Sequence, residues 1–177
     1  MSQRAVFLDR DGTLIEDPGY LGDPEQVVLI EGVPQALRRL AGAGFALVVI
    51  SNQAGVARGF FTEDDVRAVN ERVASLLATE DASLDGWYWC MHHPELTGPC
   101  ACRKPGTELL RRAARDHDLD LEASWIVGDH PSDVEAGRRV GARGILVLSG
   151  HSHAGDAPPD APVAADLAAA ADLILHP

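Results

Sequence analysis

Ala5-Val6-Phe7-Leu8-Asp9-Arg10-Asp11-Gly12-Thr13 (residues 5–13) joins an apolar run directly to two carboxylates that stand two residues apart. Such a run predicts a buried strand of a parallel sheet, whose carboxyl end opens into the crevice where open α/β folds bind ligands. We expect Asp9 and Asp11 to face this crevice. Two like charges so close need a cation, and Mg²⁺ prefers oxygen ligands. A solvated Asp-Gly turn is the alternative interpretation.

Two later segments offer groups that bind phosphate. Leu47-Val48-Val49-Ile50 is a second predicted buried strand, and the Ser51 hydroxyl after it can hold phosphate oxygens without adding charge, unless Ser51 is only a turn residue. Lys104 is the only lysine among 15 basic residues. Its compact charge suits a phosphoryl group crowded beside a metal better than the planar arginine fork does. Chance in an arginine-rich composition is the alternative, but the site otherwise lacks a cation.

A third strand, Trp125-Ile126-Val127-Gly128, ends at Asp129, which we expect to be the remaining protein ligand of Mg²⁺. Ser132 and Glu135 have the spacing of a capping box that opens a helix. Asp133 then falls in the first helical turn, where it could act only as a partner of the helix dipole. We therefore rank Asp133 below Asp129 as a ligand.

All three cysteines, Cys90, Cys100 and Cys102, fall within thirteen residues, close to His92 and His93. Three thiols and one histidine make a complete tetrahedral set for structural Zn²⁺, which leaves no open position for chemistry. A disulfide is the alternative, but an odd count leaves one cysteine unpaired, and an intracellular chain keeps its thiols reduced. The pattern predicts a zinc-binding loop beside Lys104, although spacing does not choose between the two histidines.

These segments, taken in order, resemble the haloacid dehalogenase superfamily of phosphatases over nearly the whole chain. The resemblance implies that Asp9 is a nucleophile that forms an aspartyl-phosphate, and that Asp11 is the general acid and base. It also implies that Mg²⁺ is bound by Asp9, the Asp11 carbonyl and Asp129. Ser51 and Lys104 complete the implied catalytic set.

The Asp-Arg-Asp-Gly-Thr motif, Ser-Asn-Gln-Ala-Gly-Val-Ala-Arg-Gly (residues 51–59) and Cys-x-Cys-Arg-Lys-Pro resemble more narrowly the D,D-heptose 1,7-bisphosphate 7-phosphatases and the related histidinol-phosphate phosphatases. The resemblance implies hydrolysis of the C7 phosphate of D-glycero-D-manno-heptose 1,7-bisphosphate. The implied zinc ligands are Cys90, His92, Cys100 and Cys102. We expect Asn52, Arg58 and Arg103 to bind substrate, because an acidic chain needs local cations to hold an anionic substrate. Either arginine could instead be a solvated loop cation.

Two alternatives stay open. The loop from His92 to Cys100 is short for a heptose enzyme, which keeps histidinol phosphate as a second candidate substrate, whereas His93-Pro94 and residues 19–21 favour the heptose branch. His130 is a further departure, because many relatives carry lysine after the Gly-Asp pair. A non-catalytic, zinc-stabilised binding module that kept the scaffold is the alternative of a different class.

Composition agrees with a small enzyme. The chain has 177 residues, 46% of them apolar, which predicts one core and a single phosphatase domain over residues 1–177. Its 15 basic and 27 acidic side chains give a formal net charge of −12, which argues against nucleic acid and anionic membranes as partners. We expect a monomer acting on a small sugar phosphate. Because no apolar signal core or membrane span is evident, we expect a cytoplasmic protein.

Strands alternate with helices between these motifs, which predicts a doubly wound parallel sheet. The resemblance implies the Rossmann-like haloacid dehalogenase fold. Residues 14–32 are too few for a cap domain, so we expect a capless site roofed by loops. The helix after Thr62 should bury a stripe of apolar residues, Val66, Val69, Val73, Leu76 and Leu77. Residues 150–162, with His151 and His153, are expected to form a solvated loop rather than a metal site. Other predicted elements are helices at 33–41, 109–114 and 163–171, and strands at 87–89, 145–148 and 173–175.

Overall fold

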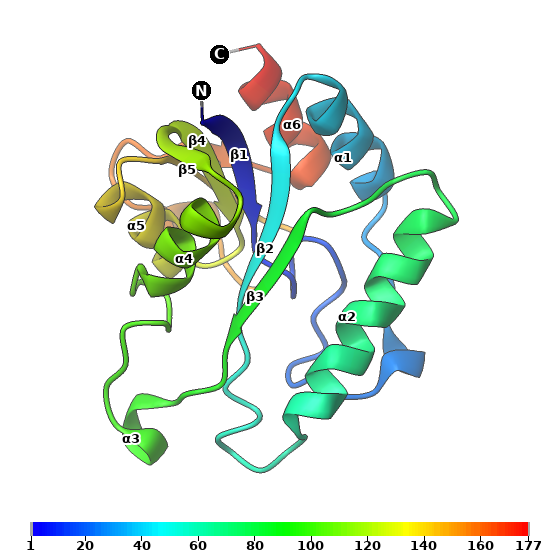
Figure 1. The fold of residues 1–177 in the computed structure, drawn as a ribbon, viewed down its shortest axis with the longest axis vertical. Helices are drawn as coiled ribbons and strands as arrows, with labels where there is room; N and C mark the ends of the chain where they lie inside the picture. The colour runs from blue at the N-terminus through cyan, green and yellow to red at the C-terminus, as the bar shows by residue number, and fades with distance from the viewer. Residues whose placement is uncertain (1, 177) are drawn as a thin grey trace.

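The computed structural model describes residues 2–176, and its centre is a six-stranded parallel sheet (Figure 1). The strands are β1 (Gln3–Leu8), β2 (Ala46–Asn52), β3 (Gly86–Cys90), β4 (Leu119–Gly128), β5 (Arg143–Val147) and β6 (Val163–Ala164). Their order in the sheet is β3-β2-β1-β4-β5-β6. The predicted doubly wound sheet is confirmed. The chain changes direction across the sheet between β1 and β4, and ligands of open α/β folds bind at such a switch point.

Strand β1 lies at the centre of the sheet and pairs with both β2 and β4. Its last four residues, 5–8, are completely buried, as their apolar run requires. The Ala5 amide donates a 2.8 Å hydrogen bond to the Ser124 hydroxyl of β4, 119 residues further along the chain. Just beyond β1, the Asp9 amide donates to the Val127 carbonyl, so β4 fixes the backbone of the first predicted site residue.

Helices cover both faces of the sheet (Figure 1). Val6 and Leu8 of β1 belong to the core on one face, and Ala5 and Phe7 belong to the core on the other, as strand alternation requires. The first core includes residues of α1 (Val33–Gly42), α2 (Glu63–Ala78) and α6 (Leu167–Leu175). The second includes residues of α4 (Glu108–Asp116) and α5 (Pro131–Arg139). The shorter elements are η1 (Pro24–Gln26), α3 (Pro94–Thr97) and η2 (Ala154–Asp156).

Helix α2 begins as predicted, with Thr62 as its N-cap and a reciprocal capping box between Thr62 and Asp65. The buried face of the helix differs from the predicted stripe at two positions. Leu76 is only partly buried, whereas Asn70 is 8% exposed and takes a place among the buried valines and leucine. A polar side chain in an apolar helix face requires a hydrogen-bond partner, which is described below.

The prediction for the C-terminal segment is wrong in part. Instead of a helix at 163–171 and a strand at 173–175, the edge strand is β6 and the helix is α6. The Asp166 carboxylate accepts a hydrogen bond from the Ala169 amide and starts the helix. Leu167, Ala170 and Ile174 recur at helical spacing and are buried, so one apolar face packs on the sheet and on α1.

Segment 14–32 contains one short 3₁₀ turn and two isolated bridges, so the expectation that it is too small to form a cap domain is met. Residues 150–162 are a loop that carries only η2, as predicted. Within residues 2–176, no helix combines the length and apolar character needed to cross a bilayer.

Candidate active site and metal centres

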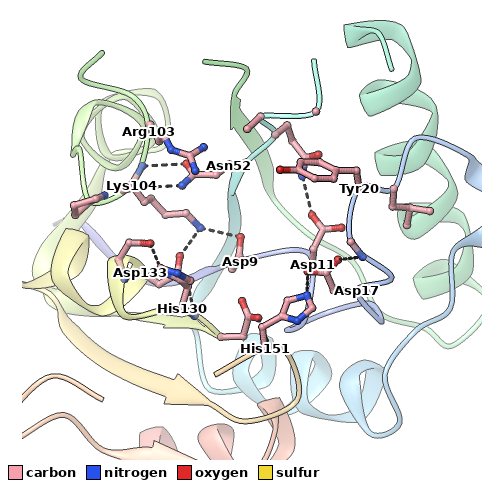
Figure 2. Close-up of a pocket in the computed structure, with 18 of the residues that line it drawn as sticks. Asp9, Asp11, Asp17, Tyr20, Asn52, Arg103, Lys104, His130, Asp133 and His151 are labelled. Atoms are coloured by element: carbon pink, nitrogen blue, oxygen red, sulfur yellow. Dashed lines mark hydrogen bonds and ion pairs between the residues drawn. The ribbon is translucent and has the colours of Figure 1, made fainter. Parts of the chain in front are cut away.

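A cavity of about 490 Å³ lies at the carboxyl end of the sheet (Figure 2). It is lined by six of the predicted catalytic, substrate-binding and magnesium-binding residues, Asp9, Asp11, Asn52, Arg103, Lys104 and Asp129. Asp9 follows β1 and Asp129 follows β4, so the two carboxylates flank the topological switch point. Residues far apart in the sequence therefore meet at one edge of the sheet, as predicted.

Three carboxylates in this cavity form what we term the acidic cluster. Asp9, Asp129 and Asp133 each place an oxygen within 4.8 Å of the others. The Lys104 ammonium lies 2.8 Å from Asp9 Oδ1 and 2.5 Å from Asp133 Oδ1, and it donates to the Ile50 carbonyl at 2.5 Å. Lys104 is 4% exposed. A buried ammonium with two carboxylate partners is held in one position.

Burial and charge shift the protonation equilibria of this cluster. Burial raises the pKa of Asp9 well above its ordinary value; Lys104 opposes this shift, and the charges of Asp133 and Asp129 add to it. Burial also raises the pKa of Asp129. Burial alone would lower the pKa of Lys104, but Asp133 and Asp9 outweigh it and raise that pKa above its ordinary value. Lys104 therefore stays charged at neutral pH.

The acidic cluster fits a divalent cation. Its donors are carboxylate oxygens, which Mg²⁺ prefers, and one ammonium balances only one of three carboxylates. The carboxylates that Lys104 does not balance leave the cluster short of positive charge. A cation beside Asp9 and Asp129 would supply it.

Two glycines allow Asp129 to reach its position. Asp129 Oδ2 accepts a 3.0 Å hydrogen bond from the His151 amide. A Cβ on Gly150 would lie 1.9 Å from that oxygen, and one on Gly12 would lie 2.5 Å from it. Gly12 also has φ +79°, a backbone conformation that disfavours other residues. The glycine of the Asp-x-Asp-Gly-Thr motif thus leaves room for a carboxylate that the sequence places 117 residues later.

Asp11 lines the same cavity but is held by a separate set of donors. Arg10 donates to Asp11 Oδ2 through Nε at 3.2 Å and to Asp11 Oδ1 through Nη2 at 3.1 Å. The Gln53 amide donates to Asp11 Oδ2 at 2.7 Å. Sequence reasoning did not single out Arg10 or Gln53, although both stand in the motifs that carry the resemblance.

The start of α5 corrects one sequence prediction and explains Asp133. The N-cap is His130, which forms a capping box with Asp133, so the predicted box between Ser132 and Glu135 is wrong. Pro131 at the first helical position moves the start of the helix two residues earlier. Asp133 then occupies the third helical position, where it is 1% exposed and pairs with Lys104. An acid in the first turn of a helix that starts at the ligand-binding edge was the signal for this role.

The last residues of β2 position Lys104 and form part of the cavity wall. Asn52 Oδ1 accepts from the Lys104 amide at 3.0 Å, and its Nδ2 donates to the Lys104 carbonyl at 3.3 Å. Ser51 is 3% exposed and its hydroxyl accepts a 2.7 Å hydrogen bond from Gln53. Ser51 is not among the lining residues, so its contact with phosphate stays a prediction.

Cations and aromatic rings mark the rim of the cavity. Arg103 lines it, and its guanidinium lies 3.5 Å from the His92 carbonyl. Arg58 lies outside the lining, 3.0 Å from the His93 ring and 5.7 Å above the centre of the Tyr20 ring. Tyr20, from segment 14–32, is a lining residue (Figure 2). The predicted substrate-binding arginines thus stand on the same side as the cysteine loop.

His151, which the sequence placed in a solvated loop, contributes to the lining of the cavity. The predicted solvated loop 150–162 is confirmed, but His151 lines the cavity and its ring lies 2.9 Å from an Asp17 oxygen (Figure 2). This contact joins segment 14–32 to the loop after β5 across the cavity. No local pattern in the sequence links these two segments.

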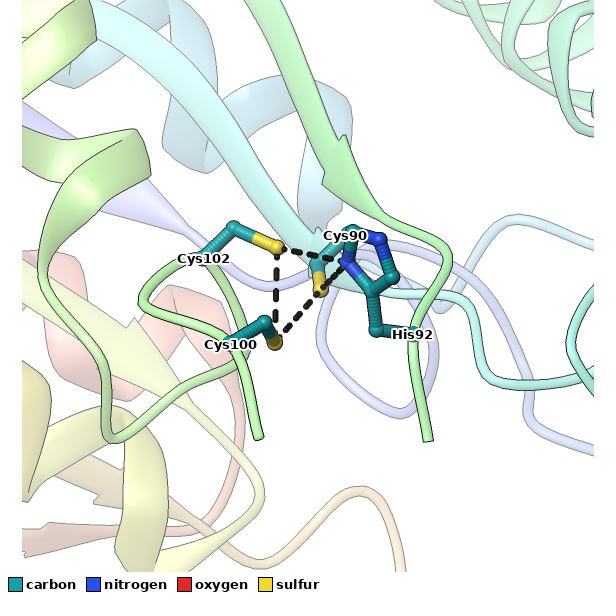
Figure 3. A group of neighbouring side chains, drawn as sticks. All are labelled: Cys90, His92, Cys100 and Cys102. Carbon is teal, nitrogen blue, oxygen red and sulfur yellow. Dashed lines mark hydrogen bonds between the residues drawn. The ribbon is translucent and has the colours of Figure 1, made fainter. Parts of the chain in front are cut away.

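The cysteine cluster, Cys90, His92, Cys100 and Cys102, lies at the end of β3 and in the loop before Lys104 (Figure 3). Its sulfur atoms are 3.8 Å apart for Cys90–Cys100 and 3.6 Å for Cys100–Cys102, and His92 Nδ1 lies 3.5 Å from Cys90 and 3.1 Å from Cys102. A tetrahedral ion with Zn–S bonds of about 2.3 Å requires sulfur separations of about 3.8 Å. The four atoms therefore fit Zn²⁺. His92 is the histidine in the cluster, whereas His93 contacts Arg58.

The thiols of this cluster lack a balancing charge of their own. Burial raises the pKa of Cys90 and Cys102. Burial alone would also raise the pKa of Cys100, but hydrogen bonds from the Arg103 amide and the other two thiols outweigh it and lower that pKa. All three cysteines are free. A metal ion is the group that would stabilise three neighbouring thiolates here.

The chain is similar to a known hydrolase family and to named phosphatases. Residues 101–170 match the HAD-hydrolase-like family model. The chain is 39% identical over 179 aligned positions to the D-glycero-beta-D-manno-heptose-1,7-bisphosphate 7-phosphatase of Yersinia pestis, with 97% of this chain and 89% of that protein covered. It is 42% identical to the D-glycero-D-manno-heptose-1,7-bisphosphate 7-phosphatase of Thermosynechococcus vestitus, with 98% and 96% covered.

Among solved structures, the fold is similar to the D,D-heptose 1,7-bisphosphate phosphatase of B. bronchiseptica, which was crystallised with magnesium and phosphate. The TM-score is 0.88 at 33% sequence identity, and the alignment covers 97% of this chain and 98% of the other. The similarity therefore extends over nearly the whole fold.

Proposed function

This chain belongs to the heptose 1,7-bisphosphate 7-phosphatase family of the HAD-like hydrolases, and from this premise we propose that it removes the C7 phosphate of D-glycero-D-manno-heptose 1,7-bisphosphate. The relatives are phosphatases, so the chain is a phosphoric monoester hydrolase. We propose that residues 1–177 work as one phosphatase domain and as a monomer.

The observation that carries the proposal is the position of Lys104. Its buried ammonium joins Asp9 to Asp133 beside Asp129, so a nucleophile, a cation and candidate metal ligands meet in one cavity. Asp9 lines that cavity and its Oδ1 is oriented by Lys104 at 2.8 Å. A transferring phosphoryl group would find a carboxylate for attack and an ammonium for its oxygens.

The residues that would hold Mg²⁺ are Asp9, Asp129 and the Asp11 carbonyl. When bound, the ion would neutralise charge on the phosphoryl oxygens. Lys104 remains in place through Asp133, which the sequence had ranked lower, and through the backbone pairing with Asn52. These contacts fix the ammonium before substrate binds, so little reorganisation accompanies the reaction.

The chemical steps use Asp9 and Asp11. A carboxylate oxygen of Asp9 forms a bond to phosphorus while the bond from phosphorus to the C7 oxygen breaks, and Asp11 gives that oxygen a proton. Water then attacks the aspartyl-phosphate, transfers a proton to Asp11, and releases phosphate as the bond from phosphorus to Asp9 breaks. Asp11 returns to its starting protonation state.

The cysteine cluster is joined to the active site by a short stretch of backbone. Cys102 is two residues from Lys104, and Arg103 stands between them on the cavity wall. We propose that structural Zn²⁺ at Cys90, His92, Cys100 and Cys102 fixes this short segment. Arg103 and, at the rim, Arg58 would then meet the sugar hydroxyls or the second phosphate, since a bisphosphate offers charge for them.

The test compares kcat/KM for heptose 1,7-bisphosphate, histidinol phosphate and p-nitrophenyl phosphate. We expect the heptose bisphosphate to exceed the others by at least about tenfold, because only it offers a second phosphate to the arginines. A higher kcat/KM for histidinol phosphate would contradict the proposed substrate. Equal kcat/KM values for all three compounds would show that the enzyme is not specific for a sugar phosphate.

The nucleophile is tested by Asp9→Asn, with the exposed Asp64→Asn as the matched control. Loss of a nucleophile typically costs about 10⁴-fold or more in kcat. Asp64→Asn should retain full activity. Turnover that survives Asp9→Asn would remove the proposed covalent mechanism, whereas a protein without any turnover would fit the binding-module alternative.

A further inference from the structure

Arg10 is a buried cation that lies behind the lining of the active-site cavity and contacts Asp11. Its side chain is fully buried, and within residues 2–176 Asp11 is the only carboxylate at ion-pair distance from it. Each of its three nitrogen atoms has a partner: Nε and Nη2 bind the two oxygens of Asp11, and Nη1 donates to Asn70 Oδ1 at 2.9 Å. The guanidinium therefore lies between Asp11 and helix α2.

Asn70 explains why this guanidinium keeps its orientation. It stands on the buried face of α2 between Val69 and Val73, where its polarity disrupts an otherwise apolar stripe. Its carbonyl oxygen is the acceptor for Arg10 Nη1, which would otherwise be a buried donor without a partner. A guanidinium is planar, so fixing Nη1 also fixes the edge that faces Asp11.

The donors around Asp11 leave one position open. A carboxylate has about four lone-pair sites on its two oxygens. Oδ2 accepts from Arg10 Nε and from Gln53, whereas Oδ1 accepts only from Arg10 Nη2. Asp11 lines the cavity, so the remaining site on Oδ1 is available to a substrate oxygen.

We propose that Asn70 is a positioning residue for catalysis: through Arg10 it orients the Asp11 carboxylate so that Oδ1 exchanges the proton with the leaving oxygen and with water. This inference rests on the proposed role of Asp11 and adds the residue of α2 that sets its geometry. Without the Asn70 acceptor, Arg10 turns to find another, and the two-point hold on Asp11 loosens. Proton transfer depends on hydrogen-bond reach, so a small displacement slows it.

The test uses two substrates that differ in their need for a proton. The value of kcat/KM reports the steps up to formation of the phosphoenzyme. An alkyl phosphate such as heptose 1,7-bisphosphate needs protonation of its leaving oxygen, whereas p-nitrophenyl phosphate releases a stable anion. We expect Asn70→Leu, which keeps the volume but removes the acceptor, to lower kcat/KM about tenfold for the alkyl phosphate and less than about twofold for the aryl phosphate.

Two controls separate positioning from stability. Asn70→Asp keeps an acceptor for Arg10 and should restore the wild-type ratio of alkyl to aryl activity to within about threefold. Val73→Ala, on the same buried face one turn further along, destabilises α2 by loss of packing but should leave that ratio unchanged. An equal loss for both substrates in Asn70→Leu, or an altered ratio in Val73→Ala, would overturn the inference.

Asp11→Asn distinguishes failure of this inference from failure of the proposed function. We expect it to reduce alkyl activity more than aryl activity, and more strongly than Asn70→Leu does. If Asp11→Asn lowers alkyl and aryl activity equally, Asp11 is not the general acid. The proposed roles of Asp11 and of Asn70 are then both wrong. If Asp11→Asn lowers alkyl activity more than aryl activity while Asn70→Leu lowers both equally, only the proposed role of Asn70 is refuted.

Discussion

The acidic cluster and the cysteine cluster both gather like charges around a small space, but they are assembled and balanced differently. Asp9 and Asp129 follow β1 and β4, and Asp133 stands in the first turn of α5; the ammonium of Lys104 pairs with Asp9 and Asp133. The cysteine cluster comes from thirteen residues, and within it the neighbours of each thiol are other thiols and one imidazole.

This difference indicates which cluster depends on a metal for its shape. The acidic cluster has a resident cation, two glycines that accommodate Asp129, and a helix N-terminus at Asp133, so its geometry is held by the fold. The cysteine loop between β3 and α4 contains only the short helix α3. We therefore expect the order of this loop to depend on the Zn²⁺ that we propose for the cysteine cluster.

The largest effects are expected from selective removal of each metal, which tests whether the two clusters differ in their dependence on metal. Stripping zinc with 1,10-phenanthroline should lower Tm by about 5–10 °C, which corresponds to roughly 2–4 kcal/mol for a chain of this size. Omitting magnesium should stop turnover yet change Tm by less than about 2 °C. Differential scanning calorimetry, with metal content verified in each sample, measures both. An unchanged melting curve after complete loss of zinc would contradict a structural role.

A smaller effect is expected from crowding the acidic cluster. In Gly150→Ala the new Cβ would meet Asp129 Oδ2, so the carboxylate must move. A displacement of about 1 Å can cost about 100-fold in rate, so kcat should fall by about that factor while Tm stays within a few degrees. Gly155→Ala, in the same loop, is the matched control, because a Cβ there would have no atom within 4 Å. Full activity in Gly150→Ala would show that the fold does not fix Asp129 tightly.

The smallest effect belongs to a feature outside both clusters, the Thr62–Asp65 capping box. Hydrogen bonds from the Thr62 amide and hydroxyl lower the pKa of Asp65, so its carboxylate stabilises the folded state above the unfolded pKa of about 3.8. That stabilisation is lost as pH falls through the lower, folded pKa. Thr62→Ala should cost about 1 kcal/mol at pH 7, measured by urea unfolding, and the difference from wild type should shrink in acid. A difference that grows in acid would refute this assignment.

Sequence patterns identified the parts of the site that combine a buried strand with a terminal polar residue. Asp9 and Asp129 follow β1 and β4 as expected, because the carboxyl ends of parallel strands meet at one edge. The cysteine cluster was visible because all its members lie close together in the chain. The alternation of strands and helices was sufficient for the fold class.

The parts that were missed depend on contacts between distant segments. Sequence analysis did not identify Asn70, because its partner Arg10 is 60 residues away. Asp133 was assigned to the wrong position in its helix because the Ser132–Glu135 spacing competed with Pro131. At the C-terminus, apolar residues at 173–175 suggested a strand, but capping by Asp166 and a buried alanine-rich face favour a helix.

The central position of β1 has a consequence for biosynthesis. The strand that precedes Asp9, the proposed nucleophile, leaves the ribosome well before β4, because the Ser124 hydroxyl that accepts the Ala5 hydrogen bond is translated 119 residues after Ala5. At a translation rate of about 5–20 residues per second, the edge of β1 that pairs with β4 stays unpaired for roughly 6–24 s. During that interval the nascent chain exposes an apolar strand edge, a natural target for chaperones.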